Sequence, residues 1–91
     1  MENDIEILKK RFEVFPAVTV TMDEPADKEN GLWHLDLVQG EKRVTVGWKR
    51  EKGFGLSETS AFKQVVYGEG WEHVTTSLEG AFMKAQMMLL N

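Results

Sequence analysis

Three segments in the first half of the chain alternate apolar and polar residues, which is the period-two pattern of a strand with one buried face. The segments are 17–22, 32–38 and 43–49. Their apolar positions are Val18, Val20 and Met22, then Trp33, Leu35 and Leu37, then Val44, Val46 and Trp48. Each segment is therefore predicted to be a half-buried β-strand.

A tight hairpin is predicted between the second and third of these segments. Gly40 and Glu41 suit the central positions of a type II′ turn, which takes glycine first. A turn at this point pairs Val38 with Arg43, Leu37 with Val44, Leu35 with Val46, and Trp33 with Trp48. A shift of one residue would turn the apolar set of one strand toward water, so the pattern specifies the register.

Helices are predicted at both ends of the chain. Asn3 and Glu6 have the spacing of a capping box. The residues that follow place Ile5, Leu8, Phe12 and Phe15 at helical intervals, up to Pro16. Thr76 and Glu79 repeat the capping-box spacing, and a second helix is expected from about Ser77. Its apolar face would be Leu78, Ala81, Phe82, Ala85, Met88 and Leu89.

Residues 51–75 have no clear hydrophobic period. Half of the eight glycines of the chain fall here, at positions 53, 55, 68 and 70. Residues 54–56 are expected to extend the third strand beyond a bulge. Residues 61–67 fit either a short helix or a strand, because so short an apolar run suits both. We therefore predict an irregular excursion that contains one short element.

These elements together predict a single α+β domain over residues 1–91. It is a two-layer sandwich in the order α-β-β-β-(short element)-α, with an antiparallel sheet of three to four strands and two helices on one face. The opposite face of the sheet is expected to be polar and to lie in solvent. Its residues are Thr19, Thr21, His34, Asp36, Thr45 and Lys49.

The composition narrows the class of protein. The 91 residues are 42% hydrophobic and 29% charged, which is ordinary for a globular domain. The chain has no cysteine, which fits a reducing compartment. The N-terminal residues lack the apolar core of a signal peptide, and the longest apolar run, Met87–Leu90, is too short to span a bilayer. We therefore expect a cytoplasmic protein with no membrane contact.

Residues that suggest catalysis or metal binding are sparse. His34 and Asp36 share a strand face, and His73 is the other histidine, but their spacing matches no metal-binding motif. We favour the alternative that Asp36 orients or pairs with His34. No serine lies in a G-x-S-x-G motif. The expectation is a protein with no catalytic residue, no metal, no cofactor and no enzymatic activity.

The second helix carries the apolar residues that the predicted core does not use. Met83, Met87 and Leu90 recur at i, i+4 and i+7, roughly opposite the predicted core-facing side. Methionine adapts to irregular partners, and tryptophans such as Trp71 often anchor interfaces. We therefore predict a small interaction or regulatory module that binds a protein partner or a second copy through these four residues. The alternative is that residues 51–75 fold over the stripe and complete the core.

A basic segment supports a second hypothesis. Five of the eleven basic residues lie within 42–52, next to a glycine-rich turn. Such a segment suits the binding of anions or nucleic acid. The residues concerned would be Arg43, Lys49, Arg50, Lys52 and Phe54. A charged edge strand explains the same pattern. The net charge of −4 also opposes polyanions, so nucleic acid is the less favoured partner.

Overall fold

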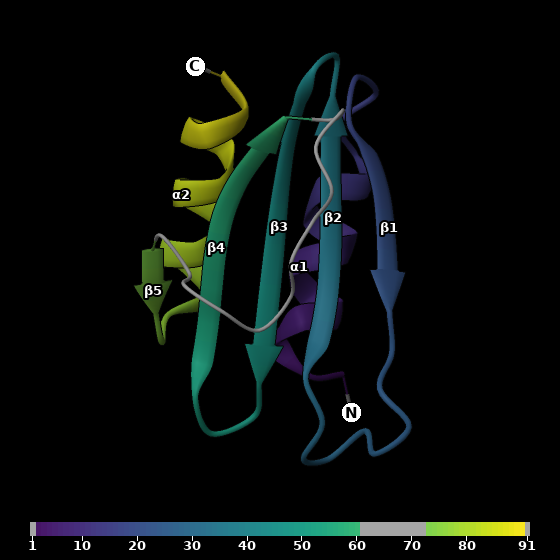
Figure 1. Ribbon diagram of the computed structural model, residues 1–91, viewed down its shortest axis with the longest axis vertical. Coiled ribbons are helices and arrows are strands. Elements are labelled where there is room, and N and C mark those ends of the chain that lie inside the picture. Colours follow the sequence, from purple (N-terminus) through teal and green to yellow (C-terminus); the bar gives the residue numbers. More distant parts are fainter. Residues whose placement is uncertain (1, 61–72, 91) are drawn as a thin grey trace.

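The computed structural model describes residues 2–60 and 73–90. In this part of the chain, two helices and five strands form a two-layer α+β sandwich, as Figure 1 shows. The elements are α1 (Asp4–Glu13), β1 (Thr19–Asp23), β2 (Trp33–Gln39), β3 (Lys42–Lys49), β4 (Gly53–Ser60), β5 (His73–Thr75) and α2 (Leu78–Leu90). Both helices lie behind the sheet in this view, so the predicted sandwich with helices on one face is confirmed.

The strands form one antiparallel sheet in the order β1-β2-β3-β4-β5. The predicted hairpin between β2 and β3 is confirmed, with Trp33 opposite Trp48 and Leu35 opposite Val46. Gly40 has a φ of 62°, and within the described residues no other type of residue has a positive φ. A positive φ at the first central position alone is the geometry of the predicted type II′ turn.

The sheet has more strands than the sequence pattern predicts. Residues 54–56 do not extend β3, and β4 is instead a separate strand that pairs with β3 from Lys49 opposite Gly53 onward. The chain reverses over residues 50–52, where the Lys52 amide donates to the Lys49 carbonyl at 3.1 Å, and Gly53 follows with a φ of 87°. This is a three-residue hairpin loop, and the positive φ of the residue directly after it favours glycine there. The prediction of an irregular segment is therefore wrong for residues 53–60, whereas residues 61–67 lie outside the described part.

The core lies between the helices and the sheet. Apolar side chains from three neighbouring strands meet there, and Trp33 and Trp48 pack edge to face with their ring centroids 6.3 Å apart. From the helices, Phe12 contacts Phe82 at a centroid distance of 5.2 Å. The buried core residues are Ile5, Leu8, Phe12, Trp33, Leu35, Leu37, Val44, Val46, Trp48, Phe54, Leu56, Ala81, Ala85, Met88 and Leu89.

The opposite face of the sheet is less open to solvent than the alternation predicts. Thr19, Thr21 and Lys49 are exposed as expected, but Asp36 is only 9% exposed and Thr45 only 1%. Asp36 accepts hydrogen bonds from Arg43 at 2.6 Å and from the Thr45 hydroxyl at 3.1 Å. A carboxylate held by charge-assisted and neutral hydrogen bonds tolerates burial. The prediction of a fully solvated polar face is therefore wrong at its centre.

Both helices begin at a side-chain cap. The predicted capping box of α1 is present, with the Glu6 amide donating to Asn3 Oδ1 at 3.0 Å and the Asn3 amide to Glu6 Oε1 at 3.2 Å. At α2 the predicted cap is displaced by one residue, because Ser77 rather than Thr76 accepts from a helical amide. The Gly80 amide donates to Ser77 Oγ at 3.0 Å. Each cap satisfies amides that have no partner inside the helix.

Candidate functional site

The inner side of α2 is built from side chains that fit closely against the sheet. Ala81 and Ala85 are fully buried, and α2 contacts β3, β4 and β5. Met88 and Leu89 are buried as well, while Leu78 and Phe82 are half-buried against the same core. The core-facing side of α2 is thus the one that the sequence predicts.

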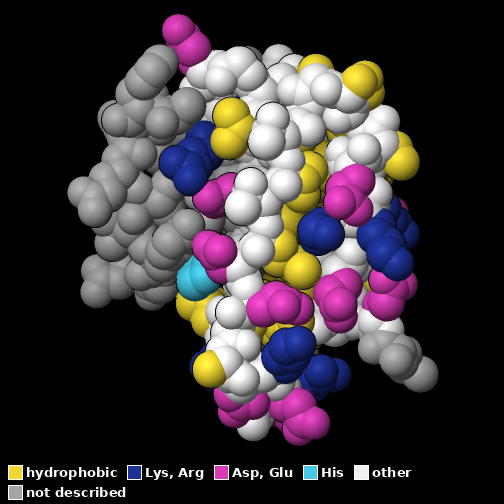
Figure 2. All heavy atoms as spheres, turned by 90° about the vertical axis from the view of Figure 1, so that its right-hand side faces the viewer, with side chains coloured by type: hydrophobic (Ala, Val, Ile, Leu, Met, Phe, Trp, Pro, Cys, Tyr) yellow, Lys and Arg dark blue, Asp and Glu magenta, His cyan; other side chains and the backbone are white. Residues whose placement is uncertain are grey.

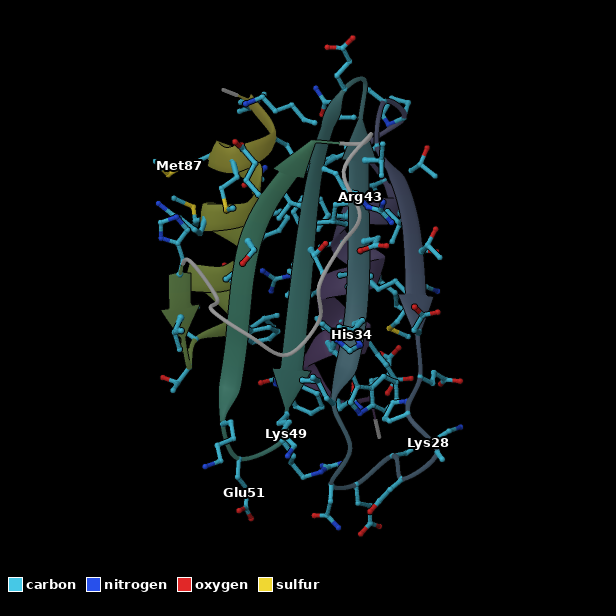
Figure 3. The ribbon with its side chains drawn as sticks, in the orientation of Figure 1. Lys28, His34, Arg43, Lys49, Glu51 and Met87 are labelled. Carbon is cyan, nitrogen blue, oxygen red and sulfur yellow. The ribbon has the colours of Figure 1, made fainter. Side chains whose placement is uncertain are left out.

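The outer side of α2 remains apolar and exposed. Met83, Met87 and Leu90 are 58%, 55% and 77% exposed, which makes them three of the five large exposed hydrophobic residues in the described chain. Figure 3 shows Met87 projecting from the outer side of α2. We call these three residues the methionine stripe. Within the described residues the stripe is uncovered, whereas the alternative that residues 51–75 fold over it falls largely on residues 61–72, which lie outside the described part.

An apolar hollow of about 240 Å³ adjoins the stripe at its C-terminal end. It lies where α1 has ended and the chain turns toward β1, beside the last turn of α2. Leu90 belongs both to the stripe and to the hollow. The lining residues are Phe12, Phe15, Pro16, Ala17, Val18, Gln39, Gln86, Leu89 and Leu90. Exposed apolar side chains beside a concave apolar surface are typical of a protein contact site.

Contacts between the two helices hold this surface in place. Arg11 of α1 pairs with Glu79 of α2 at 2.6 Å, and its guanidinium carbon lies 5.3 Å from the centre of the Phe82 ring. Phe15, which follows α1, stacks on Phe82 with a centroid distance of 6.2 Å. These contacts join the end of α1 and Phe15 to α2, beside residues that line the hollow.

The sequence prediction missed most of the hollow. Residues 15–18 connect α1 to β1 and read only as a helix end followed by a strand. The available signal was Phe15, an apolar residue beyond the end of α1, directly before a proline that stops helices. Trp71, the fourth predicted contact residue, lies outside the described residues.

The five residues predicted to bind anions or nucleic acid do not lie together in the structure. Arg43 is on the helix-free face of the sheet and is bound to Asp36. Phe54 is only 1% exposed and packs against Trp48 in the core, with ring centroids 6.3 Å apart. Phe54 therefore has no free face on which a base could stack, and this part of the hypothesis is wrong.

The other three basic residues stay together at the turn between β3 and β4. Lys49 and Lys52 border a hollow of about 330 Å³ that contains the glycines at 47, 53 and 55. Arg50 lies over the Trp48 ring, 6.0 Å from its centre. Acidic residues share this end, because Glu29 and Glu51 line the adjoining hollow of about 170 Å³ with the same cations. Figure 3 shows Lys49 and Glu51 near each other at this end of the sheet.

His34 lies on β2, on the face of the sheet opposite the helices (Figure 3). Partial burial lowers the pKa of its imidazole, while the charges of Asp23 and Asp36 act in the opposite direction. In the described part of the chain, no three histidine, cysteine or carboxylate side chains are grouped as metal ligands. The Asp36 carboxylate accepts hydrogen bonds from Arg43 and Thr45, so it is not dedicated to orienting His34.

Comparison with known proteins adds no assignment to this geometry. No family model, no curated protein and no solved structure matches the chain. Among the described residues, no helix is both long enough and apolar enough to cross a membrane.

Proposed function

We propose that the chain is a non-enzymatic interaction module, working in the cytoplasm, that binds a protein partner through the methionine stripe and the adjoining hollow. The observation that carries this proposal is the exposure of Met83, Met87 and Leu90 on one side of a helix whose other side is buried. Monomeric proteins seldom expose contiguous apolar surface without a use for it.

The chemistry of the surface indicates the kind of partner. Within the described residues of α2, only Glu79 and Lys84 carry charge, so the surface offers few fixed polar contacts. Methionine side chains are flexible and polarisable, which suits a partner with an irregular apolar surface. The hollow beside Leu90 can receive one apolar side chain of that partner, an arrangement typical of interface hot spots.

Anion or nucleic-acid binding at the basic segment receives less support. Arg43 is engaged with Asp36, Phe54 is buried, and the remaining cations share their end of the sheet with acids. A protein of net charge −4 also repels polyanions at long range. The α2 surface therefore carries the proposal.

The test is a matched pair of substitutions that place the same charge in two exposed apolar positions. Met87→Glu puts a carboxylate in the stripe, whereas Val74→Glu puts one on β5, where Val74 is also largely exposed. A partner is first isolated by affinity capture and purified, and its Kd is then measured by titration calorimetry. We expect Met87→Glu to weaken binding about tenfold or more, which is about 1.4 kcal/mol, and Val74→Glu to leave the Kd unchanged.

The control is the free energy of unfolding, measured in urea. Both variants should unfold like the original chain, because neither residue is buried. Equal Kd values for the two variants would contradict the proposal.

A further inference from the structure

Among the described residues, the outer edge of β1 is a second surface without a pairing partner, distinct from the methionine stripe. β1 ends the sheet on one side and pairs with β2, through the register from Thr19 opposite Val38 to Asp23 opposite His34. No other strand in residues 2–60 and 73–90 pairs with it. Alternate backbone groups of β1 therefore point away from the sheet, and such groups are a template for another strand.

β1 lacks most of the features that normally prevent pairing of edge strands, and its one charged residue is Asp23 at its end. Its sequence, TVTMD, contains no lysine and no proline, and its backbone pairs in unbroken register without a bulge. Natural edge strands usually carry at least one of these features. The other edge of the sheet, β5, is only three residues long and offers less to a partner.

The side chains along this edge also favour a covering partner. Val18, Val20 and Met22 are only partly buried, although they pack against the core. Figure 2, which views this edge directly, shows a band of apolar side chains with acidic and basic side chains beyond it. The flanking charges are of both signs, so a second copy would not meet a surface of like charge.

We propose that two copies of this chain pair antiparallel through β1, about a two-fold axis at Thr21. This register places Thr21 opposite Thr21 of the second copy, Val20 opposite Met22, and Thr19 opposite Asp23. Apolar residues then face apolar residues on the helix side, and polar residues face polar residues on the other side. No acid lies opposite an acid. The contact is self-complementary, as a two-fold interface requires.

The position of α1 is compatible with this pairing. α1 contacts both β1 and β2, and neighbouring strands lie about 4.8 Å apart. A helix above the middle of that pair lies about 5 Å from the proposed axis by the same spacing. The two α1 helices would then run about 10 Å apart, which is the upper end of ordinary helix packing distances. The pairing extends the sheet without forcing the helices into each other.

A disulfide test reads the register directly, because the chain has no cysteine of its own. In the proposed pair, directly opposed Cβ atoms lie about 5 Å apart. Residue 19 of one copy lies opposite residue 23 of the other, so the two copies of residue 19 are offset by four residues along the strands, or about 14 Å. We expect mild oxidation to convert Thr21→Cys into a covalent dimer at least tenfold faster than Thr19→Cys. A mixture of Thr19→Cys and Asp23→Cys should cross-link as readily as Thr21→Cys.

Charge substitutions test the same register without a covalent bond. Light scattering should give twice the chain mass of 10.4 kDa for the original protein. Thr21→Lys opposes two lysines across the axis and should weaken the dimer at least tenfold, whereas Thr19→Lys meets Asp23 of the second copy and should retain it. Thr19, Thr21 and Asp23 are all exposed, so substitutions at these positions should leave the fold intact. Circular dichroism of each variant checks this.

The outcome is separable from that of the α2 proposal. Met87→Glu should leave the mass and the cross-linking rate unchanged. A mass of 10.4 kDa up to millimolar concentration would overturn the inference. Equal cross-linking of Thr21→Cys and Thr19→Cys, or a dimer that Met87→Glu abolishes, would overturn it as well.

Discussion

The two helices lie on the same face of the sheet but present opposite kinds of surface to solvent. The outer side of α1 carries ion pairs, Lys9 with Glu13 and Lys10 with Glu2. The outer side of α2 carries Met83, Met87 and Leu90. A charged outer side is sufficient for a helix that only covers a core. The apolar outer side of α2 is therefore the surface on which the proposed contact with a partner depends.

The inner sides of the helices differ as well. α1 fills its part of the core with large side chains, Ile5, Leu8 and Phe12, whereas α2 places Ala81 and Ala85 against the sheet. Small residues allow a helix backbone to approach a sheet closely, but each contributes little apolar burial. α2 also adds Met88 and Leu89 to the core, so stability should depend on the inner sides of both helices and little on the outer side of α2.

The largest effect is expected at Phe12. Phe12→Ala removes a fully buried ring that contacts Phe15 and Phe82 at centroid distances of 5.4 Å and 5.2 Å. Such a truncation costs about 3–5 kcal/mol of the free energy of unfolding, as measured in urea. Val14→Ala, two residues away and largely exposed, should cost no more than about 0.5 kcal/mol. Similar costs for both would contradict the expectation that stability depends on the buried side of α1.

Adjacent leucines test the same contrast within α2. Leu89 is 4% exposed and Leu90 is 77% exposed, so one substitution can be made on each side of the helix. We expect Leu89→Ala to cost about 2–5 kcal/mol of unfolding free energy and Leu90→Ala to stay within about 0.5 kcal/mol. Partner binding should show the reverse order. Under conditions in which both variants are folded, Leu90→Ala should weaken binding more than Leu89→Ala. If Leu90→Ala unfolds the domain, the outer side of α2 belongs to the core.

The helix caps should give a smaller effect. Asn3→Ala removes the side-chain oxygen that accepts from the Glu6 amide in the α1 capping box, and Ser77→Ala removes the oxygen that accepts from the Gly80 amide at α2. Each loss is expected to cost about 1 kcal/mol, measured by thermal and urea unfolding. Asn3→Asp and Ser77→Thr, which keep an accepting oxygen, are the matched controls. A cap substitution that is neutral would mean that packing alone fixes that helix end.

The smallest effect is expected from pH, and it arises on the face opposite both helices. Because burial holds the pKa of His34 below its ordinary value of 6.5, the unfolded chain takes up a proton at this residue before the folded chain does. Stability should therefore fall as the pH drops below about 6.5, toward the lowered pKa. The free energy of unfolding, measured in urea between neutral and mildly acidic pH, should fall less steeply with decreasing pH for His34→Gln than for the original chain. An unchanged slope would place the pH dependence on other groups.

Most of the fold could be predicted because its signals are local. The register of β2 on β3 follows from alternating apolar residues on both sides of a two-residue turn. β4 was not predicted as a separate strand, because Gly53 and Gly55 interrupt its apolar pattern. Phe54 and Leu56 nevertheless both face the core. The burial of Asp36 was missed because a single carboxylate in a strand reads as solvated. The same register nevertheless places it opposite Thr45 and beside Arg43.

The candidate site was predicted only in part. Helical spacing alone located Met83, Met87 and Leu90 on the outer side of α2, since a helix wheel needs no tertiary information. The hollow depends on how the turn after Phe15 lies against the end of α2, and the sequence has no local signal for that contact. The basic segment shows the opposite failure. Residues 43 and 54 are close to 49–52 along the chain but have different surroundings in space.

The sequential strand order has a consequence for how the molecule assembles. In the described part of the chain, each strand hydrogen-bonds to the strand before or after it in sequence. The loops between β2, β3 and β4 are two and three residues long, so closing them sacrifices little chain entropy. Chains dominated by such local pairings tend to fold quickly. We therefore expect β2, β3 and β4 to pair early in stopped-flow experiments. The packing of α1 against α2, which are distant in sequence, should be the slower step.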